Sequence, residues 1–221
     1  MEDICDYRLR FLYFDIHINE YDSLNFSLMI IFSALEKLRN RRMIIAALKE
    51  AAAEIIEENK IIFSTLVAEV EKQFRLDINS LHGVSHWDRV RKIGSHLVEK
   101  TDADLRVIIL FSALHDACRE NEGADSEHGS RAVEYLLGLY NKGLLPVDNA
   151  RQLSQLMYAC EHHNKKGAQS NDITIQTCWD ADRLDLYRVG AVPDPAFLYT
   201  EAGKSPEMID FALQLWLKSR R

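Results

Sequence analysis

Residues 1–82 of this 221-residue chain contain neither glycine nor proline, and the first proline of all is Pro146. Both residue types interrupt regular secondary structure, so their scarcity predicts helices joined by short polar turns and an all-α fold. Long hydrophobic runs are also missing. The longest one near the N-terminus, residues 24–35, is broken by polar side chains and is shorter than the roughly 20 residues that a membrane helix needs.

Cysteines are few, at Cys5, Cys118, Cys160 and Cys178. They form no CxxC pair, which excludes a zinc cage made of thiolates and favours reduced thiols in a cytoplasmic protein. The chain begins with acidic residues, unlike a basic signal peptide. A net charge of -7 argues against a nucleic-acid or anionic-membrane partner, so a phosphorylated ligand would have to meet local positive charge.

The apolar stretch from Val107 to Cys118, VIILFSALHDAC, contains the adjacent polar pair His115 and Asp116. A helix that is apolar on every side belongs in the centre of a domain. A carboxylate and an imidazole there face a low dielectric, where an unpaired charge costs several kcal/mol. We therefore expect a cation beside this pair, with both side chains on the central helix.

Helical phase brings further polar side chains onto inward stripes of other helices. His86 shares a stripe with Val90 and Ile93, and Asp182 shares one with Cys178, whereas Asp180 is turned away. His128 and His163 also lie on inward stripes, and phase favours His163 over His162. We expect Ser126, Asp148, Asp172 and Ser205 to cap the helices that follow the central one.

Each of these residues alone is more often a satisfied core histidine or a surface aspartate. Together they predict a site for a divalent transition metal (Mn, Fe, Ni, Co or Zn), because imidazole nitrogen mixed with carboxylate oxygen suits such ions. Residues 1–77, which carry apolar stripes and a single histidine, His17, predict a helical extension that packs on the main domain or joins subunits in a homo-oligomer.

Three ordered segments, HWDRV from His86, ALHDA from Ala113 and DADRLD from Asp180, resemble the HD superfamily of metal-dependent phosphohydrolases. The resemblance implies an all-α HD domain over residues 78–221. It implies that the metal is held by His86, His115, Asp116 and Asp182. The segments SEHGSRA and ACEHH resemble positions that hold a second metal in some members, which makes His128, His162 and His163 candidates for a second metal or a phosphate contact.

The resemblance predicts hydrolysis of a small phosphorylated metabolite, such as a nucleotide, by metal-activated water. Candidate catalytic residues are Asp116, Arg89, Arg183 and Asp185, and candidate substrate contacts are Arg119, Lys165 and Lys166. The sequence favours one tightly held ion, because it supplies no carboxylate beyond Asp116 and Asp182 to offset a second dication. Two alternatives stay open: a di-iron oxygenase, and a non-catalytic nucleotide-sensing or scaffold module.

Overall fold

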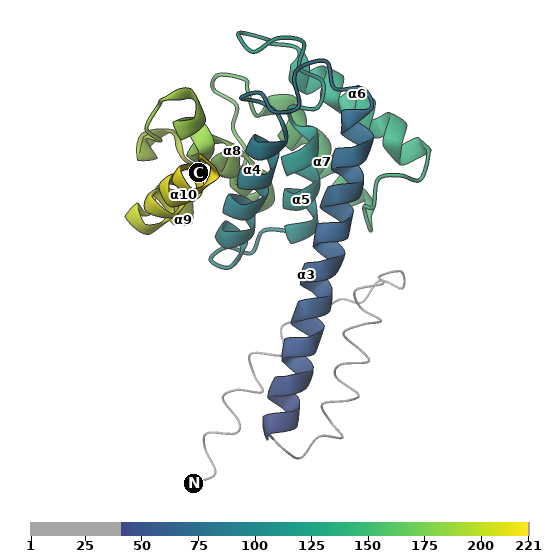
Figure 1. Ribbon diagram of the computed structural model, residues 1–221, viewed down its shortest axis with the longest axis vertical. Coiled ribbons are helices and arrows are strands. Elements are labelled where there is room, and N and C mark those ends of the chain that lie inside the picture. Colours follow the sequence, from purple (N-terminus) through teal and green to yellow (C-terminus); the bar gives the residue numbers. More distant parts are fainter. Residues whose placement is uncertain (1–40, 221) are drawn as a thin grey trace. The chain divides into compact units, whose positions relative to one another are not determined.

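The computed structural model describes residues 41–220, which are helical and contain no strand (Figure 1), so the all-α prediction is confirmed. The α-helices are α3 (Arg41–Glu71), α4 (Val84–Val98), α5 (Leu105–Leu114), α6 (His128–Asn141), α7 (Ala150–His162), α8 (Ile173–Leu184), α9 (Glu201–Lys204) and α10 (Pro206–Ser219). Two short 3₁₀ helices, η2 (Asp185–Val189) and η3 (Pro195–Phe197), lie between α8 and α9. None of the described helices is both long and apolar enough to cross a bilayer.

One compact unit runs from Glu54 to Arg221. It includes the second half of α3, where Phe63, Leu66 and Val70 are buried in the core. Residues 1–40 of the predicted helical extension lie outside the described residues. That residues 1–77 act as an extension stays a prediction.

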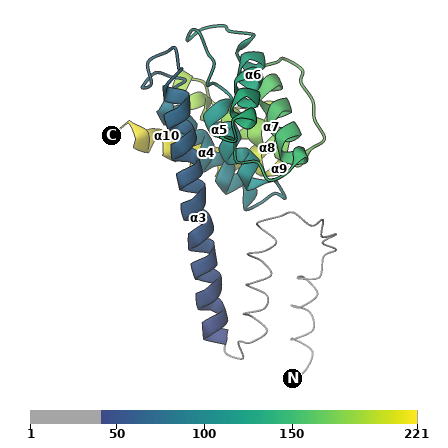
Figure 2. The same cartoon turned by 90° about the vertical axis from the view of Figure 1, so that its right-hand side faces the viewer.

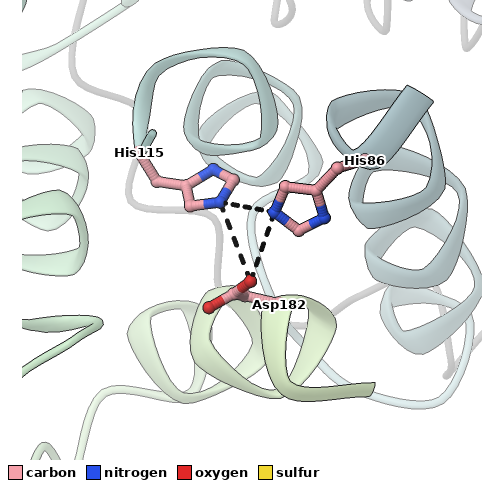
Figure 3. Close-up of side chains that lie close together, drawn as sticks. All are labelled: His86, His115 and Asp182. Atoms are coloured by element: carbon pink, nitrogen blue, oxygen red, sulfur yellow. Dashed lines mark hydrogen bonds and ion pairs between the residues drawn. The ribbon is translucent and has the colours of Figure 1, made fainter. Parts of the chain in front are cut away.

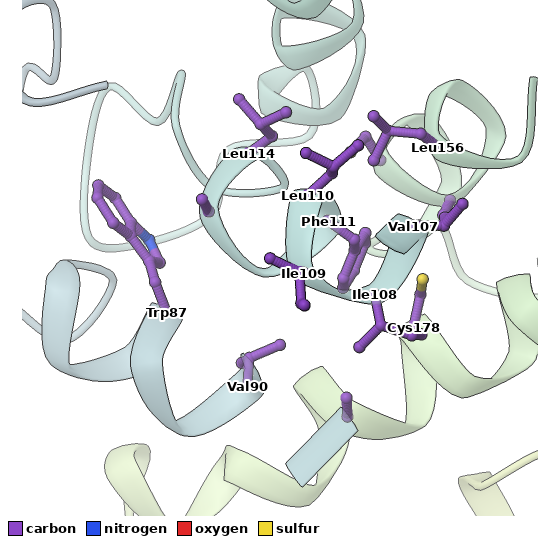
Figure 4. Close-up of a cluster of buried hydrophobic side chains, with 14 of the residues drawn as sticks. Trp87, Val90, Val107, Ile108, Ile109, Leu110, Phe111, Leu114, Leu156 and Cys178 are labelled. Atoms are coloured by element: carbon purple, nitrogen blue, oxygen red, sulfur yellow. The ribbon is translucent and has the colours of Figure 1, made fainter. Parts of the chain in front are cut away.

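Helix α5 is at the centre of this unit and packs against α4, α7 and α8 (Figure 2). Every side chain from Val107 to Leu114 is buried, as expected for a helix that is apolar on all sides. Its neighbours contribute Trp87 from α4, Leu156 from α7 and Cys178 from α8 to the same core (Figure 4). Full burial of a large apolar side chain stabilises the fold by about 1.5–3 kcal/mol. The buried side chains of α5 therefore fix the position of the residues that follow this helix.

The two ends of α5 are fixed by local hydrogen bonds. Asp104 caps the first turn, where its carboxylate accepts from the backbone N–H groups of Arg106 and Val107. The helix ends at Leu114, so Asp116 does not lie on it as the sequence predicted. Beyond it the backbone tightens, with the Ala117 N–H donating to the Leu114 carbonyl three residues back. Asp116 therefore leaves the helix on a tight turn.

The other predicted caps are partly correct. Asp172 caps α8 and Ser205 caps α10, as expected. Helix α7 is capped by Asn149 and not by its neighbour Asp148. Helix α6 begins at His128, one residue after Glu127, and Ser126 does not cap it, so His128 occupies its first position.

Candidate metal centre

Three helices bring His86, His115 and Asp182 together, which Figure 3 shows in close-up. His86 lies on α4, His115 directly follows the last residue of α5, and Asp182 lies on α8. The Nε2 atoms of the two histidines are 3.1 Å apart. Oδ1 of Asp182 is 3.4 Å from Nε2 of His86 and 3.7 Å from Nε2 of His115. We call these three side chains the first donor set.

A second pair of histidines lies close to the first. The Nε2 atoms of His128, at the start of α6, and His163, just after α7, are 2.8 Å apart. The two helices approach closely because Gly129 has no side chain: a Cβ atom there would lie 2.7 Å from the carbonyl oxygen of Cys160. We call His128 and His163 the second donor set.

Asp116 lies between the two sets and offers one oxygen to each. Its Oδ2 is 3.5 Å from Nε2 of both His86 and His115. Its Oδ1 is 3.2 Å from Nε2 of His128 and 3.6 Å from Nε2 of His163. The tight turn after Leu114 is what places this carboxylate, since it separates Asp116 from the regular helix.

The hydrogen bonds at Nδ1 of the four histidines set their tautomers. Nδ1 of His86 donates to the Asp185 carboxylate, and Nδ1 of His128 donates to the Asp125 carbonyl. Nδ1 of His115 and of His163 donate to backbone carbonyls in the same way. In the neutral rings each Nε2 therefore carries a lone pair.

Two facing lone pairs at these distances repel each other, so a positive charge has to lie between the rings of each pair. A metal ion or a proton supplies it. The first donor set gives a further sign that a cation fits here, because Oδ1 of Asp182 is buried and has no hydrogen-bond partner among the described residues. The donor atoms and their orientation therefore fit a transition metal.

The pKa values in the first donor set agree with a positive charge between its two histidines. Burial and the charge of Arg188 lower the pKa of His86, but three carboxylates outweigh them and raise it to about 9. Burial lowers the pKa of His115 to about 3. Two imidazoles so close cannot both be charged, so in the metal-free protein one proton, on His86, takes the place of the cation. Burial would raise the pKa of Asp116, yet the surrounding histidines hold it well below its usual range.

Arg89 and Asp185, two of the predicted catalytic residues, lie behind His86. Nε and Nη2 of Arg89 donate to the two oxygens of Asp185, at 2.6 and 2.9 Å. Asp185 is fully buried and accepts from Nδ1 of His86 at 2.7 Å. The pair thus orients the ring of His86.

Four other candidates lie away from the donor atoms. Arg183 donates to the Phe197 carbonyl and stacks on a tyrosine ring, and His162 packs against Tyr158. Lys165 pairs with Glu161, and Lys166 is exposed. Within residues 41–220, no hydrogen bond or ion pair joins these four side chains to either donor set. Asp180 also points elsewhere, as expected, although it is buried and accepts from Tyr199 and Thr200.

Arg119 is the predicted substrate contact that the structure does bring to the centre. Its Nη1 lies 3.5 Å from Oδ1 of Asp116, and the rest of the guanidinium is held by the carbonyls of Asn121 and Gly123. Arg119 therefore adds positive charge on the side of the second donor set.

Two residues near the donor sets were not among the site residues predicted from the sequence. Arg188 has Nη2 3.5 Å from Oδ1 of Asp182, and its side chain is 8% exposed. Helical phase could not find it, because α8 ends at Leu184 and η2 follows a tighter repeat. His82 is also buried near His86, and its Nδ1 is 2.6 Å from the Glu122 carboxylate.

No family model matches the chain, and no curated protein does. Among solved structures, the chain is similar to one described as a predicted HD superfamily hydrolase from an uncultured Thermotogales bacterium. The two are 23% identical, with a TM-score of 0.51, over 72% of this chain and 87% of that one. The chain therefore has the HD-domain fold that its three sequence segments predicted.

Proposed function

We propose that the protein is a metal-dependent phosphohydrolase that acts on a small phosphorylated metabolite, such as a nucleotide. The observation that supports this most is the position of Asp116, with one carboxylate oxygen facing each donor set. Two buried arginines beside the same centre, Arg119 and Arg188, supply the positive charge that a phosphoryl group needs. Nucleic acid and membrane are not part of the proposal.

The geometry favours two metal ions over the single ion preferred from the sequence. His86, His115, Asp182 and Oδ2 of Asp116 would hold the first, and His128, His163 and Oδ1 of Asp116 would hold the second. The sequence argument counted Asp116 once, whereas its two oxygens point in two directions. Metal ions bound there lower the pKa of water towards neutrality and polarise a phosphoryl oxygen.

The remaining side chains prepare this centre. Asp185, fixed by Arg89, keeps the proton of His86 on Nδ1 and so leaves Nε2 free to act as a ligand. The Phe111 and Cys160 carbonyls do the same for His115 and His163. Because all four rings are buried, their orientation is set before any substrate arrives.

The test is release of inorganic phosphate from a panel of nucleotides and sugar phosphates, with protein loaded in turn with Mn, Fe, Co, Ni and Zn. We expect turnover that a chelator abolishes and that the metal restores. Protein that retains its metal but cleaves no phosphoester in the panel would contradict the proposal.

A second candidate is a di-iron oxygenase, since four imidazoles around one carboxylate also suit an iron pair that activates oxygen. The positive charge of Arg119 and Arg188 favours the phosphohydrolase. Mössbauer spectra of protein purified with iron, together with oxygen consumption in the presence of candidate substrates, separate the two functions.

A further inference from the structure

Arg188 is buried beside the first donor set with part of its guanidinium unused. Its Nη1 donates to the backbone carbonyl of Asp185 at 3.2 Å, which anchors the side chain. Its Nη2 is 3.5 Å from Oδ1 of Asp182, but the two atoms do not form a hydrogen bond. Its Nε is buried without a partner among the described residues. A buried charged donor of this kind is costly unless an acceptor arrives.

The other buried arginines near the centre have their donors engaged. Nε and Nη2 of Arg89 donate to the two carboxylate oxygens of Asp185, and Nη1 of Arg89 donates to a serine hydroxyl. Nε and Nη2 of Arg119 donate to backbone carbonyls. Of these three guanidiniums, that of Arg188 combines a position at the first donor set with a buried nitrogen that lacks an acceptor.

We propose that Arg188 binds a non-bridging oxygen of the substrate's phosphoryl group and thereby selects phosphate monoesters over phosphate diesters. The inference rests on the proposed phosphohydrolase function and names the substrate class for that site. Guanidinium is suited to this contact because its planar donors match phosphate oxygens and it stays charged at every physiological pH.

The charge balance of the centre explains the preference for a monoester. Asp185 is neutralised by its paired hydrogen bonds with Arg89. The carboxylates of Asp116 and Asp182 are then balanced by the guanidiniums of Arg119 and Arg188. Any divalent ion therefore leaves the centre with an excess of positive charge, which a dianionic monoester offsets better than a monoanionic diester.

The experiment compares wild type with Arg188→Gln and Arg188→Lys. Binding of inorganic phosphate to metal-loaded protein is measured by calorimetry, and metal content is measured on the same samples. Turnover of p-nitrophenyl phosphate is compared with that of bis(p-nitrophenyl) phosphate. Arg106→Gln is the matched control, because Arg106 is 12% exposed and pairs with Glu58 on α3, outside both donor sets.

We expect Arg188→Gln to weaken phosphate binding about 10- to 100-fold, the loss of one charge-assisted hydrogen bond, with metal content unchanged. Its kcat/KM should fall more for the monoester than for the diester, and Arg188→Lys should recover part of both losses. Arg106→Gln should match wild type in both measurements.

Two results would overturn the inference. Unchanged phosphate affinity in Arg188→Gln would show that Arg188 does not touch the phosphoryl group. Loss of metal together with phosphate affinity in both Arg188 variants would show that Arg188 only positions Asp182. In either case a wild type that still cleaves phosphoesters leaves the proposed function standing, whereas a metal-loaded wild type that cleaves none overturns that function.

Discussion

Each histidine of the two donor sets has one ring nitrogen held by a neighbour and the other left for a cation. Three of the four are held by backbone carbonyls, and only His86 is held by a carboxylate, that of Asp185. A carboxylate stabilises positive charge on the ring far better than a carbonyl does. His86 is therefore the residue where proton and metal compete.

This competition predicts that metal affinity depends on pH. With its pKa raised to about 9, His86 is protonated in the metal-free protein at neutral pH, and a metal ion has to displace that proton. Between pH 6.5 and 8.5 the apparent affinity for the first ion should rise with pH, by up to about tenfold per unit. The slope should flatten as the pH passes the pKa of His86. Competition with a chelator of known pH dependence measures it.

Affinity that stays constant across this range would show that His86 is already neutral without metal. The Asp185→Asn variant provides a comparison, because an amide no longer stabilises the charged ring. Its pH dependence should be shallower than that of wild type.

At the scale of helices, the second donor set depends on how closely α6 approaches the end of α7. An alanine at position 129 would place its Cβ 2.7 and 2.8 Å from the carbonyl oxygens of Cys160 and Glu161. Because displacing backbone atoms costs more free energy than moving a flexible side chain, we expect Gly129→Ala to lower the stability of the fold by about 1–3 kcal/mol. It should also separate His128 from His163 and weaken binding of a second ion while the first is kept. Urea denaturation and metal titration measure the two effects.

Gly138, on the same helix, is the control. A Cβ there meets nothing within 4 Å, so Gly138→Ala should leave metal binding unchanged. It should stabilise the protein by up to about 1 kcal/mol, because alanine favours a helix. Equal effects of the two substitutions would show that the approach of α6 to α7 does not shape the site.

Helical periodicity in the sequence was enough to place most of this site. It works where a residue shares its stripe with buried apolar neighbours, as His86 and Asp182 do. It fails where the helix stops, which is why the turn at Asp116 and the position of Arg188 on η2 were not foreseen. Contacts between residues far apart in the chain, such as His86 with Asp185, leave no local signal.

At the scale of the whole chain, the compact unit needs part of α3. Phe63, Leu66 and Val70 are buried in its core, and the Tyr135 hydroxyl donates to the Glu69 carbonyl. Gln73 donates to the carbonyl of Ala117, directly after Asp116. The second half of α3 and the turn that follows it therefore support the site.

Shortened chains test this. A chain that starts at Glu54 should fold and bind metal like the full chain. A chain that starts at Asp77 lacks four buried side chains of the core, each worth about 1.5–3 kcal/mol, and should lose solubility or unfold at lower urea concentration. Circular dichroism and metal content compare the two. A soluble, metal-loaded chain starting at Asp77 would contradict this account of α3.

The same series tests the predicted self-association through the N-terminal extension. We expect the mass of the full chain in solution, measured by light scattering, to exceed that of one chain, and the chain starting at Glu54 to be monomeric. If the two chains had the same oligomeric state, residues 1–53 would not form the interface.

The bridging position of Asp116 is tested most directly by the metal content of purified protein, measured by plasma mass spectrometry after saturation and desalting. Wild type should hold two ions per chain, and the His128→Ala, His163→Ala double variant should hold one. His162→Ala should match wild type, since His162 packs against Tyr158 outside both sets. Asp116→Ala should hold none, because both sets lose an oxygen ligand. Two ions per chain in Asp116→Ala would contradict the proposal that Asp116 supplies an oxygen ligand to both ions.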